Sequence, residues 1–183
     1  MELIILLGGI ILFIIFAVLV FFTFPQFSPI PYYPSNSKDL ALILKGLSLQ
    51  NDETVVDCGA GEGLVIFAGA TQAFQKNLNT QFIAVELNPI LVAILHIRRF
   101  FHPNKKNVKI LYADLFTLNL KLQTKKVTFY FYISPWLLEK AMIPIKEITE
   151  KKRIVSYFYE IKSLTPTRVD SGIHKLYIYE NFS

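Results

Sequence analysis

Acidic side chains close three predicted strands, and their type and spacing suit the binding of a nucleotide-like ligand. Asp57, Glu86 and Asp114 each end a run of apolar and β-branched residues that is typical of a strand. A single acid in such a place is often a turn residue or helix cap. Three of them at successive strand ends favour a ligand site at the carboxyl edge of a parallel sheet.

A glycine-rich turn follows the first of these strands. Gly59, Gly61 and Gly63 occupy alternate positions, and glycine reaches positive φ without a Cβ that would hold a ligand away. Leu64 stands where the dinucleotide fingerprint G-x-G-x-x-G has its third glycine, which disfavours an NAD-type reductase. Glu86 lies about 20 residues beyond the turn, the offset at which a carboxylate binds ribose hydroxyls.

The elements that must position these residues alternate between strand and helix, which predicts a Rossmann-like, doubly wound α/β fold with a mostly parallel sheet. We expect strands at 54–58, 81–86, 108–112, 127–133, 153–160 and 173–181, and helices at 36–46, 64–76, 89–101 and 136–149. Only about a dozen residues separate the strand at 153–160 from the last strand at 173–181, which is too few for a crossover helix. That strand is therefore expected to run antiparallel beside its predecessor, which gives about six strands.

The amino-terminal segment is apolar. Leu3–Phe24 contains no charged residue, and its length suits a hydrocarbon core of about 30 Å. Neither a basic flank nor a small-residue cleavage site indicates a signal peptide. The sequence predicts a transmembrane anchor at 1–24, a proline-rich spacer at 25–35 and one α/β domain at 36–183.

The chain is basic, with a formal net charge of +5 at pH 7. Lysines follow the apolar segment, so the domain is expected on the cytoplasmic side of a plasma (inner) membrane. The lysine clusters are either solvated loops or contacts with anionic lipid. No nucleic-acid recognition motif accompanies them, and no nucleic-acid partner is expected.

The remaining reactive side chains indicate no metal site. Cys58 is the single cysteine, and its place in the first strand indicates a small core residue. The three histidines show no metal-ligand spacing with each other or with Cys58.

Taken in order, several segments resemble the class I, seven-β-strand S-adenosylmethionine (SAM) methyltransferases. Within that class the chain resembles the membrane-anchored lysine methyltransferases of the ATP synthase c-subunit and the adenine-nucleotide carrier, with their prokaryotic relatives. The segments that carry the resemblance are the glycine turn, Pro31-Tyr32-Tyr33-Pro34-Ser35, Glu86-Leu87-Asn88-Pro89, Asp114-Leu115-Phe116 and Ile133-Ser134-Pro135-Trp136.

The resemblance implies SAM as the cofactor and assigns residues to it. Glu86 is implied at the ribose, Asp114 at the adenine and Asp57 at the methionine end. The full set of implied cofactor residues is Pro34, Ser35, Asp57, Gly59, Ala60, Gly61, Glu86, Asn88, Asp114 and Leu115. On the acceptor side, the implied catalytic residues are Tyr33, Tyr132 and Trp136.

The expected activity is N-methylation of a lysine in a membrane-associated protein, with the lipid bilayer as a further partner. A lipid or quinone-like acceptor is the alternative among enzymes. A catalytically silent, membrane-tethered nucleotide-binding scaffold is the alternative of another class. The sequence leaves the oligomeric state open.

Overall fold

The computed structural model describes residues 1–23, 33–120, 122, 124–149 and 151–180, with side chains omitted at 19–23. The chain divides into two compact units, Met1–Tyr32 and Tyr33–Ser183. The first contains helix α1 (Glu2–Thr23), and the second contains the α/β domain. Phe24 and the predicted spacer as far as Tyr32 lie outside the described residues.

Helix α1 is apolar around its whole circumference. Between Leu3 and Val18 its large side chains are exposed, for example Phe13 at 70% and Leu12 at 68%. Nevertheless, none of the helices in the described ranges is long and apolar enough to cross a membrane. The predicted transmembrane span Leu3–Phe24 is therefore not supported by the structure.

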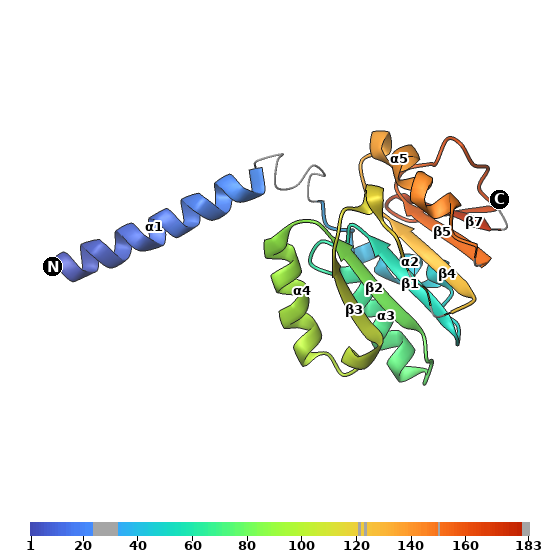
Figure 1. The fold of residues 1–183 in the computed structure, drawn as a ribbon, viewed down its shortest axis with the longest axis horizontal. Coiled ribbons are helices and arrows are strands. Elements are labelled where there is room, and N and C mark those ends of the chain that lie inside the picture. The colour runs from blue at the N-terminus through green and yellow to red at the C-terminus, as the bar shows by residue number, and fades with distance from the viewer. Residues whose placement is uncertain (24–32, 121, 123, 150, 181–183) are drawn as a thin grey trace. The chain divides into compact units, whose positions relative to one another are not determined.

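The α/β domain is built on a seven-stranded sheet with the order β3-β2-β1-β4-β5-β7-β6 (Figure 1). The strands are β1 (Glu53–Cys58), β2 (Gln81–Glu86), β3 (Val108–Tyr112), β4 (Lys126–Phe131), β5 (Lys151–Tyr157), β6 (Arg168–Ser171) and β7 (Lys175–Glu180). Strands β1 to β5 are parallel, and β6 and β7 are antiparallel to their neighbours. The predicted fold class is confirmed, and so is the antiparallel return of β7 beside β5.

The expected count of six strands is wrong, because β6 lies in the stretch assigned to a connection. Its four residues include a single aliphatic side chain, Val169, which is 44% exposed. The strand pairs only with β7, at the edge of the sheet. A short, charged edge strand buries little apolar surface, so it lacks the alternating pattern by which strands are recognised.

The helices of the domain form close to the ranges that the apolar periodicity of the sequence predicts. They are α2 (Leu40–Leu47), α3 (Leu64–Gln75), α4 (Pro89–Phe101) and α5 (Pro135–Lys146), with short 3-10 turns η1 (Ser37–Asp39), η2 (Lys105–Asn107) and η3 (Leu115–Thr117). Buried residues of α2, α3 and α4 share one core cluster with β1, β2 and β5. The buried side chains of α5 lie outside that cluster. Pro144 is inside α5, which ends two residues later, earlier than expected.

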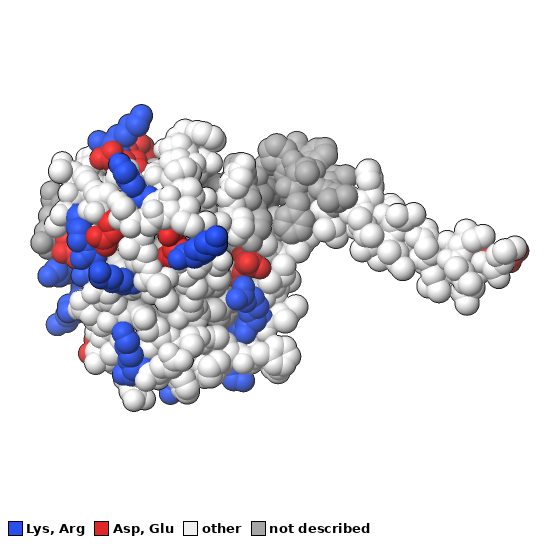
Figure 2. All heavy atoms as spheres, turned by 180° about the vertical axis from the view of Figure 1, so that it is seen from behind, with Lys and Arg blue, Asp and Glu red and all other residues white. Residues whose placement is uncertain are grey.

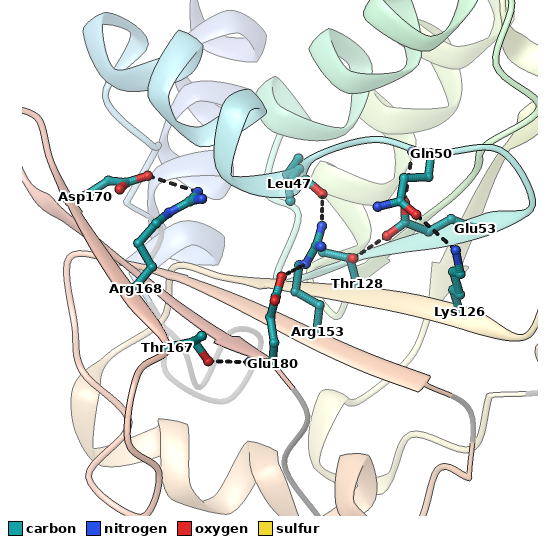
Figure 3. A network of polar contacts seen from close by, with 10 residues as sticks. All are labelled: Leu47, Gln50, Glu53, Lys126, Thr128, Arg153, Thr167, Arg168, Asp170 and Glu180. Atoms are coloured by element: carbon teal, nitrogen blue, oxygen red, sulfur yellow. Dashed lines mark hydrogen bonds and ion pairs between the residues drawn. The ribbon is translucent and has the colours of Figure 1, made fainter.

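Polar contacts join the strands at the amino edge of the sheet (Figure 3). Thr128 of β4 donates to the carboxylate of Glu53 on β1. Arg153 of β5 donates from Nε to Glu180 Oε1 of β7 at 2.8 Å, and from Nη1 to the carbonyl of Leu47 at 3.0 Å. Burial raises the pKa of Glu53. This network fixes β1, β4, β5 and β7 at the edge opposite the glycine turn.

Basic side chains are spread over the face drawn in Figure 2, with acids between them, and do not form one patch there. For this face, the distribution favours the interpretation of the lysines as solvated residues. It gives no support to a single surface for anionic lipid.

Candidate functional site

The carboxyl ends of β1, β2 and β3 lie side by side, because these strands are parallel neighbours in the sheet. In register, Cys58 pairs with Val85 and Glu86 pairs with Tyr112. Asp57, Glu86 and Asp114 therefore lie at one edge of the sheet. The structure brings these three predicted residues together with the glycine turn.

The glycine turn has left-handed backbone at all three glycines, with φ of 98° at Gly59, 56° at Gly61 and 83° at Gly63. Gly59 N and Ala60 N both donate to the carbonyl of Val85, at 3.0 and 2.9 Å. The turn is thus held against the end of β2. Its backbone is presented at the sheet edge without side chains at the glycine positions.

Gly63 is the residue of the turn most tightly enclosed by the core. A Cβ there would lie 2.6 Å from Leu95 Cδ2 and 2.7 Å from Phe67 Cε2. We expect Gly63→Ala to lower the free energy of unfolding by about 2–4 kcal/mol, since it adds backbone strain and overpacking. Urea unfolding checks this, with Gly8→Ala as the control because a Cβ at Gly8 meets nothing within 4 Å. Equal stability of the two variants would contradict the expectation.

The carboxylate of Glu86 ties the turn to the exit of β2. Glu86 is 9% exposed. Its Oε2 accepts from Gly61 N at 2.8 Å, and its Oε1 accepts from Leu87 N at 2.8 Å and from Asn88 N at 2.9 Å. A carboxylate offers about four acceptor positions, so it can still accept from a ligand hydroxyl. The three bonds fix its orientation before any ligand binds.

Asp57 is buried beside Glu86, at 3% exposure. Burial, and then the charge of Glu86, raises the pKa of Asp57 to about 8. Its cross-strand neighbour on β4 is Tyr130, whose hydroxyl lies 2.8 Å from Ser35 Oγ. Burial also raises the pKa of Tyr130. Tyr130 thus joins Ser35 to the vicinity of Asp57, a link that the sequence did not reveal.

Three other predicted cofactor residues have structural roles of their own. Asn88 caps α4, since its Oδ1 accepts from Ile90 N at 2.9 Å and Leu91 N at 3.3 Å. The side chain of Asp114 caps η3 by accepting from Phe116 N at 2.9 Å. Leu115 is buried. Their roles toward a cofactor stay predictions.

The predicted acceptor-side residues differ in their surroundings. Tyr132 lies 5.0 Å from the ring of Tyr157, and burial, with the phenols of Tyr159 and Tyr33 nearby, raises its pKa. Tyr33 is 69% exposed and Pro34 is exposed as well. Trp136, in the first turn of α5, is 74% exposed. The structure thus leaves Tyr33 and Trp136 largely exposed, while Tyr132 is partly buried against Tyr157.

Asp39 is a further buried carboxylate, and its burial was not predicted from the sequence. Asp39 is 4% exposed and accepts from Tyr157 OH at 2.8 Å and from the backbone N–H groups of Ile173 and His174, each at 2.9 Å. It joins the segment after Ser35 to β5 and to the turn between β6 and β7. An acid at the start of an otherwise apolar helix was the available signal, and it is indistinguishable from a solvated cap.

Metal binding has no structural support in the described ranges, where no group of three His, Cys, Asp or Glu side chains could hold an ion. Cys58 is buried and free, and burial raises the pKa of its thiol. It is a residue of the strand interior, as expected.

Comparison with known proteins links the chain to others through its fold. Neither a family model nor a curated protein matches the sequence. Among solved structures, an RNA methyltransferase from Salinibacter ruber in complex with S-adenosyl-L-homocysteine has a TM-score of 0.67 at 18% identity, covering 81% of this chain and 93% of its own. The 23S rRNA methyltransferase ErmE has a TM-score of 0.54 at 22% identity, with 69% and 48% covered.

A third solved structure is coclaurine N-methyltransferase bound to N-methylheliamine and S-adenosyl-L-homocysteine. Its TM-score is 0.51 at 17% identity, with 69% of this chain and 39% of its own chain covered. The present chain thus spans less than half the length of this protein and of ErmE. At such identities the likeness concerns the fold. The chain has the fold of the class I SAM-dependent methyltransferases.

Proposed function

We propose that this protein is a SAM-dependent methyltransferase. The observation that carries the proposal is the hydrogen bond from Gly61 N to the Glu86 carboxylate, which joins the glycine turn to an oriented acceptor. Gly59 and Gly61 have left-handed backbone, which glycine adopts without strain. Glu86 would accept from ribose hydroxyls, and Asp57 would offset the positive charge of the methionine end.

The chemistry asked of the protein is mostly alignment. SAM, when bound, supplies an electrophilic methyl group. The residues of the site bind the donor and hold an acceptor nitrogen in line with that methyl group, which accounts for much of the rate. No side chain has to form a covalent intermediate.

Within this proposal the acceptor is the amine of a protein lysine. A lysine has a reference pKa near 10.4 and must lose a proton before it attacks. Burial beside rings disfavours the ammonium form and so lowers that pKa. Tyr33 and Tyr132 are proposed to provide this surrounding, since the phenol of Tyr33 contributes to the raised pKa of Tyr132. Trp136 stays a predicted participant.

The proposal places the acceptor protein at a membrane. What supports it is the exposed apolar surface of α1, because a contiguous surface of this kind marks contact with lipid or with a partner. A plasma-membrane location with a cytoplasmic catalytic domain stays a prediction of the sequence. A lipid or quinone-like acceptor is the alternative that the same contact would favour.

Two measurements test the proposed function. The full chain in detergent micelles should bind SAM with micromolar affinity in titration calorimetry; a folded protein that binds neither SAM nor S-adenosyl-L-homocysteine would indicate the silent scaffold. Mass spectrometry of proteins from cells with and without the gene should then show a lysine that loses its methyl groups. Unchanged lysine methylation would refute the lysine acceptor. Altered methylation of lipids or RNA in the same cells would then identify another acceptor.

A further inference from the structure

The turn that follows β5 holds a large aromatic residue in a strained conformation. Phe158 has a φ of 73°, a left-handed value that costs a non-glycine residue about 1–2 kcal/mol. The turn is fixed on both sides: Phe158 N donates to the carbonyl of Lys175 at 2.8 Å, and Ser156 Oγ donates to the carbonyl of Tyr159 at 2.6 Å. Strain that is maintained by surrounding contacts is often found at functional sites.

Five rings form a continuous series at this point, which we name the aromatic row: Tyr132, Tyr157, His174, Phe158 and Tyr159. Successive ring centroids are 5.0, 5.5, 4.1 and 4.5 Å apart. Tyr157 is fully buried, while Phe158 is 38% exposed. The row therefore runs from the core to the surface, with its outer rings accessible to a ligand.

The aromatic row begins beside the glycine turn. Ile133, which follows Tyr132, has its Cγ2 only 3.3 Å from the position of a Cβ on Gly59. Both the row and the turn thus lie at the carboxyl edge of the sheet, the former after β4 and β5 and the latter after β1. This shared edge supports a role of the row on the acceptor side of the proposed site.

Asp39 fixes the row and adds negative charge behind it. It accepts from Tyr157 OH and from the backbone N–H of His174, both members of the row. Burial opposes its ionisation, but the N–H groups of His174 and Ile173 outweigh burial and hold the pKa of Asp39 below its usual value. Asp39 is therefore ionised at neutral pH. A cation over these rings gains from the ring faces and from this carboxylate.

We propose that the outer rings of the aromatic row, Phe158 and Tyr159, determine acceptor specificity by recognising the acceptor as an alkylammonium cation, which then loses its proton to water before its amine attacks the methyl group beside Tyr33 and Tyr132. The inference rests on the proposed methyltransferase function. Asp39 acts through Tyr157 and His174 and is a positioning residue.

The test uses the full chain in detergent micelles, saturated with S-adenosyl-L-homocysteine and labelled in its aromatic side chains. Tetramethylammonium chloride is titrated and followed by NMR, with tert-butyl alcohol as a neutral probe of similar shape. Signals of Phe158 and Tyr159 should shift saturably with the cation and much less with the alcohol, whereas Phe101 on α4 should not respond. Equal responses to both probes, or shifts confined to other rings, would overturn the proposal.

Substitutions of Phe158 distinguish a role in cation recognition from a role in packing of the domain. Phe158→Asn suits left-handed backbone but lacks the ring, so it should weaken cation binding about tenfold without lowering the melting temperature. Phe158→Tyr should retain binding to within about twofold. Asn77→Gly is the control, since Asn77 also has left-handed backbone, with φ of 54°, before β2 at the opposite edge. A fall of more than about 4 °C in Phe158→Asn would indicate a packing role and refute the proposal.

Calorimetry with S-adenosyl-L-homocysteine on the same samples distinguishes a failure of the methyltransferase proposal from a failure of the proposed role of the aromatic row. Absence of that binding would contradict the methyltransferase function itself. Cofactor binding without cation selectivity would contradict only the role of the aromatic row.

Discussion

Glu86→Gln is expected to weaken SAM binding by about 100-fold or more. In the wild type both carboxylate oxygens accept backbone N–H groups, from Gly61 on one side and from Leu87 and Asn88 on the other. Glutamine offers one oxygen, so its NH2 group must face one of these donors. The turn is released or the β2 exit is disturbed, and the proposed charge-assisted bond from a ribose hydroxyl to the remaining acceptor position of Glu86, about 1.5–3 kcal/mol, is lost as well.

Titration calorimetry with SAM measures the effect, and urea unfolding shows whether the variant stays folded. Glu62→Gln is the matched control. It removes the same charge from the same turn, but the Glu62 side chain is half exposed, and its nearest cation, Arg98, is 3.9 Å away. Similar losses in both variants would show that net charge, and not the geometry of Glu86, governs binding.

Asp57→Asn is expected to remove a large pH dependence of stability. The folded-state pKa of Asp57 is raised from 3.8 to about 8, first by burial and then by Glu86. The neutral form is therefore favoured in the folded state. Because the folded protein binds the proton of Asp57 more tightly than the unfolded chain does, protonation stabilises the fold. This stabilisation is fully present below pH 4 and is lost as the pH rises through 8.

The expected difference is at most about 6 kcal/mol, because the change of the Asp57 pKa from 3.8 to about 8 corresponds to about 1.4 kcal/mol for each pH unit. Unfolding by urea between pH 4 and pH 9 should show the wild type losing stability relative to Asp57→Asn. Asp52→Asn serves as the control, because it makes the same change of side chain at an exposed position. A parallel pH profile for Asp57→Asn and the wild type would show that Asp57 is already ionised in the folded protein.

The same residue predicts a proton linkage in cofactor binding. If the cationic methionine end lies at Asp57, SAM favours the ionised carboxylate, and binding at pH 7 should release about one proton. Calorimetry in phosphate and in Tris buffers should then give binding enthalpies that differ by the ionisation enthalpies of the buffers. The difference should vanish in Asp57→Asn.

The local elements of this fold follow from local sequence properties. Apolar periodicity gives the bounds of β2, β3 and α4 as the structure has them. Asn88 and Pro89 begin α4 in the structure as their capping chemistry indicates. The D-x-G-x-G-x-G spacing requires left-handed backbone, which the structure has at each of its glycines. These features depend on neighbours in the chain, so the sequence alone determines them.

The other features of the fold and the site depend on contacts between segments that lie far apart in the sequence. Strand β6 exists because β7 offers an edge for pairing, which no pattern within Arg168–Ser171 announces. Asp39 reaches Tyr157 across 118 positions of the chain, and Ser35 reaches Tyr130 across 95. Whether an acid is a solvated cap or a buried acceptor depends on which distant donors surround it. The strained turn at Phe158 is likewise set by its bond to Lys175 of β7.

The sequence by itself therefore determined the alternation of elements, the glycine turn and the acids at the ends of β1, β2 and β3, because each arises from residues close along the chain. Only the tertiary structure decided the seventh strand, the orientation of the Glu86 carboxylate and the aromatic row after β5. These arise where segments far apart in the sequence meet, and the free energy of such contacts is fixed by packing and desolvation in the assembled sheet.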